Sequence, residues 1–305
     1  MPATCARLVF VVWLVCAGCS SPAAEFARQA AALGLGRDVV TGTRFQHVLY
    51  RKSGSPTQTL HVYLDGDGTP WIAGRPASDP TPRNVLVLRL LTLDPAPAIY
   101  LGRPCYHGAA APGSCSSRLW TRDRYSDEVI TSLAATVRRL MAMEGAERVA
   151  WFGHSGGGTL AVLLASHFPE TTSVITIAAN LDTAAWAAYV GGQDLSGSLN
   201  PVSYPPLLRQ IQQRHYAGGK DRVVPPALTA QAAAHLGATL IVLDAYDHVC
   251  CWERLWSTIL SELAAEATPP HANKPVHSGP LQAGADAPIA PQQHYQSTDI
   301  PMTPP

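Results

Sequence analysis

The clearest indication of the fold of this 305-residue chain is the segment Arg148-Val149-Ala150-Trp151-Phe152-Gly153-His154-Ser155-Gly156-Gly157. Residues 148–152 are almost continuously apolar, which is typical of a strand buried on both faces. Residues 159–167, just beyond the quoted stretch, are expected to form a helix that ends near Pro169. The residues between them have the spacing Gly-x-Ser-x-Gly of a nucleophile elbow. The sequence therefore predicts a strand, a tight turn and a helix in that order.

Ser155, at the centre of this turn, is the candidate nucleophile. In such an elbow the serine has a strained backbone, and the flanking glycines avoid a clash with the crossing chain. The amide of Gly156 faces the N-terminus of the following helix, so it is a candidate donor to an oxyanion. A glycine-rich turn without chemistry is the alternative interpretation.

A serine hydroxyl needs a base, and we expect His248 to supply it. The chain has eleven histidines, so position has to discriminate among them. His248 lies between the last predicted strand, 238–243, and the last predicted helix, 252–265. The rival histidines lie in predicted helices or inside the elbow, where the ring is expected to point elsewhere: His167, His235 and His154.

An orienting carboxylate is predicted at Asp221, in the segment Gly218-Gly219-Lys220-Asp221-Arg222-Val223-Val224-Pro225. The chain order Ser155, Asp221, His248 is the order found when a nucleophile elbow carries a catalytic triad. Asp221 could instead cap a turn before Pro225. Three other acids are rivals, although the last of them is too close to the histidine to fold back onto its ring: Asp182, Asp194 and Asp247.

A second oxyanion donor is expected in the glycine-rich turn that follows the predicted strand 60–64. The amide of Asp67 is the first candidate and that of Gly66 the alternative, because a turn leaves backbone N–H groups without strand partners. A cation-binding loop is the competing interpretation. Asp65 and Asp67 alone supply too few ligands for calcium, and no metal or cofactor site is predicted.

Strand-like and helix-like segments alternate through residues 38–266, which predicts one domain with a mostly parallel central sheet and helices on both faces. The expected strands are 45–50, 60–64, 98–101, 148–152, 173–177, 211–216 and 238–243. The expected helices are 84–93, 126–143, 159–167, 226–236 and 252–265. The segment 178–209 leaves room for a small lid at most, which favours small or accessible substrates.

The N-terminus has the pattern of an export signal. Arg7 precedes the apolar run 8–15, which is shorter than the roughly 20 residues needed to span a bilayer. Residues 1–18 are therefore expected to be a lipoprotein-type signal peptide, with Cys19 as the lipidated residue; an ordinary cleaved signal and a secreted protein are the alternative. Residues 19–37 are expected to form a linker and a short helix.

The four cysteines of the body support an oxidising compartment, because an even number of them suggests disulfides. A bridge between Cys105 and Cys115 is the preferred pairing, across a short loop. Cys250 and Cys251 are adjacent, so a vicinal bridge and two free thiols both remain open.

The C-terminal residues 267–305 are rich in Pro, Ala, Gln and His and have no apolar periodicity, so a disordered tail is predicted. The formal net charge of the chain is zero, and a nucleic-acid binder would normally be basic. The expected partners are a small ester or acyl substrate and a membrane reached through the lipid anchor. Nothing in the sequence indicates an oligomeric state.

Several segments together resemble a family of bacterial α/β-hydrolase lipoproteins. They are Tyr63-Leu64-Asp65-Gly66-Asp67-Gly68, Asp79-Pro80-Thr81-Pro82-Arg83-Asn84, Tyr100-Leu101-Gly102-Arg103-Pro104-Cys105, Gly153 to Gly158, Asn180-Leu181-Asp182, Ser198-Leu199-Asn200-Pro201 and Asp247-His248. The resemblance covers about residues 24–265 and departs at Asp65, where glutamate is expected. It implies the α/β-hydrolase fold, export to the cell envelope and a Ser-Asp-His triad, but no defined substrate.

The function predicted from these observations is a serine hydrolase, specifically a carboxylesterase that works through an acyl-enzyme. A non-catalytic envelope lipoprotein that uses the same fold for binding is one alternative, since fold does not determine function. An acyltransferase, which would use the same acyl-enzyme, is another.

Overall fold

The predicted strand 148–152 is the middle of strand β7 (Arg148–His154), which lies inside an eight-stranded sheet. The structure is a computed structural model that describes residues 20–52, 58–109, 114–204 and 208–267. The predicted signal peptide, Cys19 and the tail from residue 268 lie outside the described residues. The described residues up to Leu263 belong to one compact unit.

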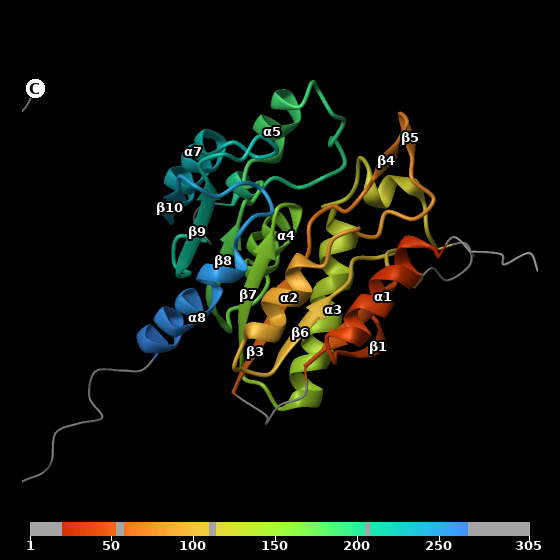
Figure 1. Cartoon of the computed structure of the whole chain (residues 1–305), viewed down its shortest axis with the longest axis horizontal. Helices are drawn as coiled ribbons and strands as arrows, with labels where there is room; N and C mark the ends of the chain where they lie inside the picture. The colour runs from red at the N-terminus through yellow and green to blue at the C-terminus, as the bar shows by residue number, and fades with distance from the viewer. Residues whose placement is uncertain (1–19, 53–57, 110–113, 205–207, 268–305) are drawn as a thin grey trace, which may run out of the picture. The chain divides into compact units, whose positions relative to one another are not determined.

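The strand order in the sheet is β1-β2-β6-β3-β7-β8-β9-β10. β1 and β2, and β2 and β6, pair antiparallel, and every other neighbouring pair is parallel, which confirms the mostly parallel sheet (Figure 1). The strands besides β7 are β1 (Gly36–Thr41), β2 (Gln46–Arg51), β3 (Thr59–Leu64), β6 (Ala98–Leu101), β8 (Thr171–Ile177), β9 (Gln213–Gly218) and β10 (Thr239–Leu243).

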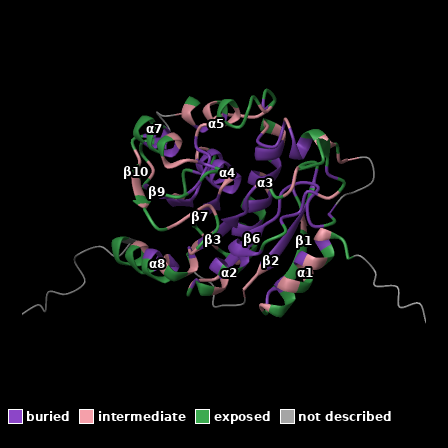
Figure 2. Cartoon of the chain, turned by 45° about the horizontal axis from the view of Figure 1, so that its top comes forward, coloured by how far each residue is buried: buried purple, intermediate pink, exposed green. Residues whose placement is uncertain are grey.

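Helices cover both faces of this sheet, as predicted. One hydrophobic core contains residues of α3 (Asp127–Glu144), α4 (Gly156–Ala165) and α7 (Pro226–Leu236). The core of the other face contains residues of α1 (Pro22–Ala32), α2 (Leu86–Leu93) and α8 (Glu253–Ala267). Figure 2 shows the buried residues concentrated in the strands and on the helix surfaces that face them.

Successive residues of the central strands point into opposite cores, because side chains alternate across a strand. In β7, Val149 and Trp151 belong to the first core, whereas Ala150 and Phe152 belong to the second. Both faces therefore need apolar side chains, which explains why the strand sequence is continuously apolar.

The N-terminal part of the described chain is more closely integrated than the sequence suggested. Residues 19–37 were expected to be a linker with a short helix, but Phe26 and Ala30 of α1 are buried in the second core. Strand β1 was not predicted, and it begins at Gly36, ahead of the expected domain start at residue 38. Its burial is too low to produce an apolar pattern, because it is an edge strand.

Two further elements were missed. Residues 71–76 form a small hairpin of β4 (Trp71–Ile72) and β5 (Arg75–Pro76). Within the segment expected to hold a small cap lies the short helix α5 (Thr183–Tyr189), which is too short to give a helical period. The 3₁₀ turns are Ser117–Trp120 and Pro201–Ser203.

Cys105 and Cys115 are joined by a disulfide, as predicted, with Cα atoms 5.8 Å apart. Cys250 and Cys251, which the sequence left open, form a vicinal disulfide. Among the described residues, no helix combines the length and apolar character needed to cross a membrane.

Candidate active site

The predicted elbow is a sharp turn between β7 and α4. Helix α4 begins at Gly156, directly after Ser155, and therefore starts three residues before the predicted residue 159. Ser155 has a φ of 53° and a ψ of −125°, a conformation that non-glycine residues adopt only when the surroundings enforce it. The surroundings here are close: a Cβ on Gly157 would lie 2.1 Å from the backbone oxygen of Leu64. The turn is therefore possible only without a side chain at this position.

The structure brings together the three side chains that the sequence singled out as a candidate triad. The Oγ atom of Ser155 is 3.1 Å from Nε2 of His248. The Nδ1 atom of the same ring is 2.8 Å from Oδ2 of Asp221. In this arrangement the ring donates to the carboxylate through Nδ1–H, which leaves Nε2 free to accept the serine proton.

Asp221 lies in the loop after β9 and is held by its own backbone. Its Oδ1 atom accepts hydrogen bonds from the amides of Val223 and Val224, at 2.8 and 2.9 Å, and its side chain is fully buried. The turn-capping interpretation is therefore correct as well, because one carboxylate oxygen caps the loop while the other contacts His248. Two contacts to one oxygen fix the direction of the second oxygen.

Two backbone amides lie where an oxyanion donor is needed. Gly156 is the first residue of α4, so its N–H has no acceptor within the helix. The turn after β3 passes directly over the serine: a Cβ on Gly66 would lie 3.7 Å from the Oγ atom of Ser155. The Gly66 amide donates to Oδ1 of Asp65 at 2.7 Å, whereas no acceptor for the Asp67 amide is found among the described residues. The geometry therefore favours Asp67 over Gly66.

Ser155 and His248 open into a cavity of about 480 Å³. Its wall contains Arg83, Trp186 and Val223 together with residues 65–68. These four residues form the turn after β3 that carries the candidate oxyanion donors, and we call it the oxyanion turn. Trp186 belongs to α5 and donates its indole N–H to the backbone oxygen of Val223, at 2.9 Å. Helix α5, which we call the cap helix, is thus connected to the loop that carries Asp221, and it forms one wall of the cavity.

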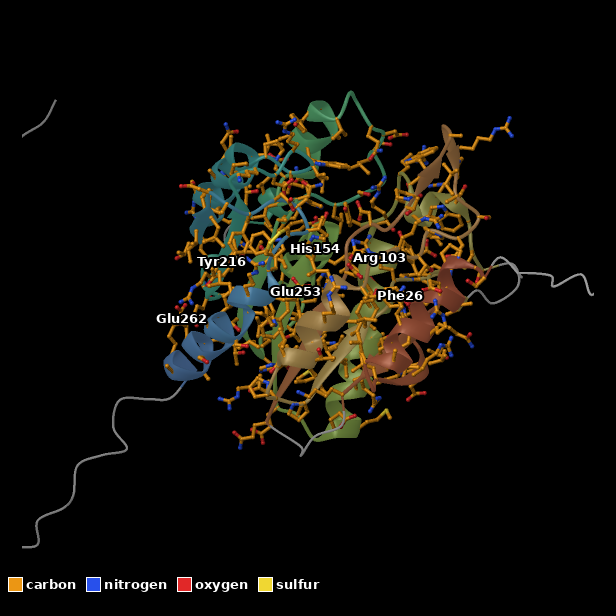
Figure 3. The ribbon with its side chains drawn as sticks, viewed as in Figure 1. Phe26, Arg103, His154, Tyr216, Glu253 and Glu262 are labelled. Atoms are coloured by element: carbon orange, nitrogen blue, oxygen red, sulfur yellow. A yellow bond between two sulfur atoms is a disulfide. The ribbon has the colours of Figure 1, made fainter. Side chains whose placement is uncertain are left out.

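His154 has a position that the sequence did not reveal. Its ring was expected to point away from the site, but its Nε2 atom lies 2.9 Å from the backbone oxygen of His248. The two rings have centroids 5.0 Å apart. Figure 3 labels His154 near the centre of the view. No local signal could have indicated this contact, because it joins residues 94 positions apart.

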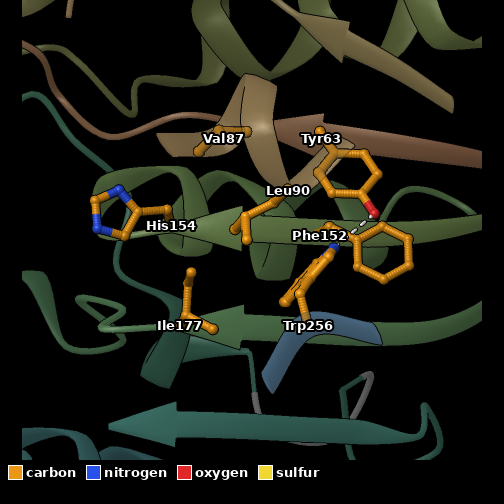
Figure 4. Close-up of a pocket in the computed structure, with 8 residues that line it drawn as sticks. Tyr63, Val87, Leu90, Phe152, His154, Ile177 and Trp256 are labelled. Carbon is orange, nitrogen blue, oxygen red and sulfur yellow. Dashed lines mark hydrogen bonds between the residues drawn. The ribbon is translucent and has the colours of Figure 1, made fainter. Parts of the chain in front are cut away.

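His154 also lines a second, much smaller cavity on the α2 and α8 side of the sheet (Figure 4). This cavity of about 10 Å³ is bordered by Tyr63, Phe152 and Trp256, and it has room for a single water molecule at most. It is therefore a packing defect beneath the elbow and too small for a substrate.

The carboxylates of the three rival acids accept hydrogen bonds from nearby backbone amides. Asp182 caps the N-terminus of α5 by accepting from the amides of Ala184 and Ala185, each at 3.1 Å. The Oδ1 atom of Asp194 accepts from the amide of Ser196, and the Oδ1 atom of Asp247 accepts from the amide of Cys250. Within the described part of the chain, none of the three forms a hydrogen bond with the ring of His248, whose partners are Asp221 and Ser155.

Several motifs behind the sequence resemblance are structural supports. Asn200 donates to the carboxylate of Asp182 at 2.8 Å. This hydrogen bond connects the two ends of residues 182–200, which we call the cap segment. The backbone oxygen of Pro80 accepts a hydrogen bond from the Thr69 amide at 2.9 Å, which anchors the chain just after the oxyanion turn.

Within the described ranges, no cluster of three or more His, Cys, Asp or Glu side chains is arranged to hold a metal ion.

Comparison with solved structures places this architecture among the α/β-hydrolases. An esterase from Pyrococcus furiosus matches with a TM-score of 0.56 and 15% identity, over 77% of this chain and 93% of the other. A candidate lipase from Acinetobacter baumannii matches with a TM-score of 0.57 and 14% identity, over 81% and 98%. A candidate α/β-hydrolase from Agrobacterium tumefaciens matches with a TM-score of 0.54 and 11% identity, over 79% and 100%.

The chain therefore has the α/β-hydrolase fold. At these identities the likeness establishes the fold alone. No protein-family model matches the sequence, and no curated protein sequence matches it.

Proposed function

We propose that the protein is a serine hydrolase that cleaves carboxylic esters through an acyl-enzyme. The observation that carries the proposal is the line of contacts from Asp221 through His248 to Ser155, at 2.8 and 3.1 Å, opening into a cavity. In the proposed reaction His248 takes the proton of Ser155 as its oxygen attacks the ester carbonyl. Asp221 stabilises the imidazolium, and the amides of Gly156 and Asp67 bind the oxyanion.

His248 then protonates the departing alcohol, and water repeats the sequence to release the acid. Because the base must be unprotonated at the start, activity should fall in acid. The esterase and candidate lipase among the structural neighbours act as precedents for this chemistry on the same fold. An accessible cavity bordered by the short helix α5 favours esters of short acyl chains.

A fluorophosphonate probe tests the nucleophile. We expect the purified protein to be labelled and to hydrolyse short p-nitrophenyl esters, and Ser155→Ala to lose both properties. Asp182→Asn serves as the control, because this partly exposed acid contacts the start of α5 and Asn200 and forms no hydrogen bond with the ring of His248. Absence of labelling in the wild type, or labelling that survives Ser155→Ala, would refute the proposal and favour a binding protein. Product analysis with competing alcohols separates a hydrolase from an acyltransferase.

We also propose that the protein is exported and anchored to a membrane by lipid on Cys19. The support is sequence alone, namely the short apolar run after Arg7 and the small residues that precede Cys19. Expression of the full chain with a labelled fatty acid should label the wild type and leave Cys19→Ser unlabelled. Release of unlabelled wild-type protein into the medium would instead indicate an ordinary cleaved signal.

A further inference from the structure

The side chain of Asp67 occupies a position that the proposed reaction does not by itself require. Its carboxylate is paired with two guanidinium groups: Nη1 of Arg124 lies 2.7 Å from Oδ2, and Nη2 of Arg103 lies 2.9 Å from Oδ1. The hydroxyl of Tyr125 lies 2.7 Å from both carboxylate oxygens. The side chains of both arginines are almost fully buried, so these contacts are shielded from water.

The backbone of the same turn is held from a second direction. Tyr106 donates its hydroxyl proton to the backbone oxygen of Asp67 at 2.9 Å. Arg103 donates through Nη2 to the backbone oxygen of Asp65 at 3.1 Å. The side chain and the carbonyl of Asp67 are therefore both held by residues outside the turn, which restricts the backbone of the residue whose N–H is the candidate donor.

The carboxylate of Asp67 also packs against the other oxyanion donor. A Cβ on Gly156 would lie 2.1 Å from Oδ1 of Asp67 and 2.4 Å from the hydroxyl of Tyr125. The Cα of Gly156 is therefore in direct contact with the paired carboxylate. One side chain connects the turn after β3 to the first residue of α4, the two elements that carry the candidate amides.

We propose that the Asp67 carboxylate, clamped by Arg124, Arg103 and Tyr125, is the spacer that sets the two oxyanion amides at their working separation. This inference rests on the proposed hydrolase function. Asp67 then has two parts to play: its backbone amide binds the oxyanion, and its side chain positions that amide and the amide of Gly156. Arg124 and Tyr125 are positioning residues that act through Asp67.

The two arginines also have an electrostatic reason to be there. Burial alone would raise the pKa of the Asp67 carboxyl, but the charges of Arg124 and Arg103 outweigh this effect and lower it to about 2. The group is thus negatively charged beside the place where an oxyanion forms. An unpaired carboxylate there would oppose the developing charge, and the two guanidinium groups cancel that repulsion.

Arg124 is itself fixed in orientation. Its Nε–H donates to the backbone oxygen of Thr121 at 2.7 Å, and Nη2 donates to Oε1 of Gln193 at 3.1 Å. Gln193 follows the cap helix and lines the same cavity as Ser155. The cap segment and the oxyanion turn are therefore joined through one guanidinium group.

The test compares Tyr125→Phe and Arg124→Lys with Asp94→Asn, measured on one short ester. Tyr125→Phe removes only the hydroxyl, and Arg124→Lys keeps the charge but loses the forked geometry. Asp94 is the matched control, because its carboxylate is also buried and hydrogen-bonded, to His61 and Tyr63, and it forms no hydrogen bond with residues 65–68 in the described part of the chain. Should Arg124→Lys fail to fold, Tyr125→Phe alone carries the test.

We expect kcat to fall about 10-fold in Tyr125→Phe and up to about 100-fold in Arg124→Lys, with KM almost unchanged, because an oxyanion contact is made in the transition state. Affinity for a trifluoromethyl ketone, which forms a tetrahedral adduct, should fall in parallel with kcat/KM. The shape of the pH profile should stay the same, since His248 is untouched. Asp94→Asn should lose thermal stability and keep its kcat.

Unchanged kcat in both variants, or an equal loss in Asp94→Asn at matched stability, would overturn the inference. A loss that appears only in KM would do the same, since it would indicate a contact with the substrate ground state. Failure of the proposed function looks different: the wild type itself would be unlabelled by the fluorophosphonate and inactive on every ester.

Discussion

The ring of His154 donates from Nε2 to the backbone oxygen of His248, at 2.9 Å. The residue before the candidate nucleophile thus holds the residue that is the candidate base, although His154 ends β7 and His248 lies in the loop between β10 and α8. We expect His154→Phe to keep the ring packing but to let the His248 loop move. Loss of one hydrogen bond of about 1 kcal/mol corresponds to a roughly fivefold lower kcat. Steady-state kinetics on a short ester measures this.

His154→Gln is the matched variant for that prediction, because it retains an N–H donor at similar reach. It should recover part of the lost rate. If His154→Phe and the wild type have the same kcat and pH profile, the contact between His154 and His248 has no influence on the base.

Substitution of two glycines by alanine should affect the free energy of unfolding very differently. A Cβ on Gly157 would lie 2.1 Å from the backbone oxygen of Leu64, which belongs to the central sheet and cannot move aside. A Cβ on Gly36 would meet only Arg51, at an ordinary distance of 3.9 Å. We therefore expect Gly157→Ala to lower the free energy of unfolding by about 3 kcal/mol or more, and Gly36→Ala to change it little. Urea unfolding of both variants measures this difference. Equal midpoints would contradict the close approach of Gly157 to the backbone oxygen of Leu64.

Three buried histidines should make the protein sensitive to acid. Burial lowers the pKa of His47 to about 4, that of His107 to about 4 and that of His215 to about 3. In the unfolded chain a histidine takes up its proton near an ordinary pKa of about 6.5. The unfolded state therefore binds more protons between these values, so stability is present above about pH 6.5 and is lost as the pH falls toward 4.

The limiting slope for three such groups is about 4 kcal/mol per pH unit. Urea unfolding at several pH values between about 7 and 5 measures it. His47→Gln should reduce the slope by about a third, whereas His235→Gln, at an exposed position on α7, should leave it unchanged. A slope that does not respond to His47→Gln would show that other groups dominate acid unfolding.

The disulfide between Cys105 and Cys115 closes a short loop that begins with Tyr106 and follows shortly after Arg103, two residues that hold the oxyanion turn. Cys115→Ser should lower the free energy of unfolding by about 2–3 kcal/mol, because the unfolded chain gains freedom when the loop is opened. Thermal unfolding with and without a thiol reductant measures this, and reduction of the wild type should lower its Tm. A Tm equal to that of the oxidised wild type would mean that the loop is held without the bridge.

Trp186 of the cap forms one wall of the cavity, so its removal should change the choice of acyl chain. We expect Trp186→Ala to raise the rate on longer p-nitrophenyl esters relative to short ones. Trp186→Phe removes the indole hydrogen bond to the backbone oxygen of Val223 but keeps most of the cavity wall. This variant should therefore keep the acyl-chain preference of the wild type. The same ratio of long-chain to short-chain rates in all three proteins would show that the acyl group lies elsewhere.

Much of the fold followed from the sequence because its signals are local. The continuous apolar run in 148–152 exists because β7 is buried on both faces, and helix 226–236 was predicted with the bounds that the structure has. Strand β1 and helix α5 were missed for the opposite reason. An exposed edge strand and a seven-residue helix do not leave a periodic apolar pattern.

Ser155, Asp221 and His248 could be proposed from the sequence alone, because each follows a strand whose end lies at the same edge of a parallel sheet. The surroundings of these three side chains depend on the tertiary structure. The contact of His154 with His248, and the pairing of Asp67 with Arg103 and Arg124, join residues far apart in the chain. Charge and hydrogen bonding act through space, so their partners are defined only when the strands and loops have been brought together.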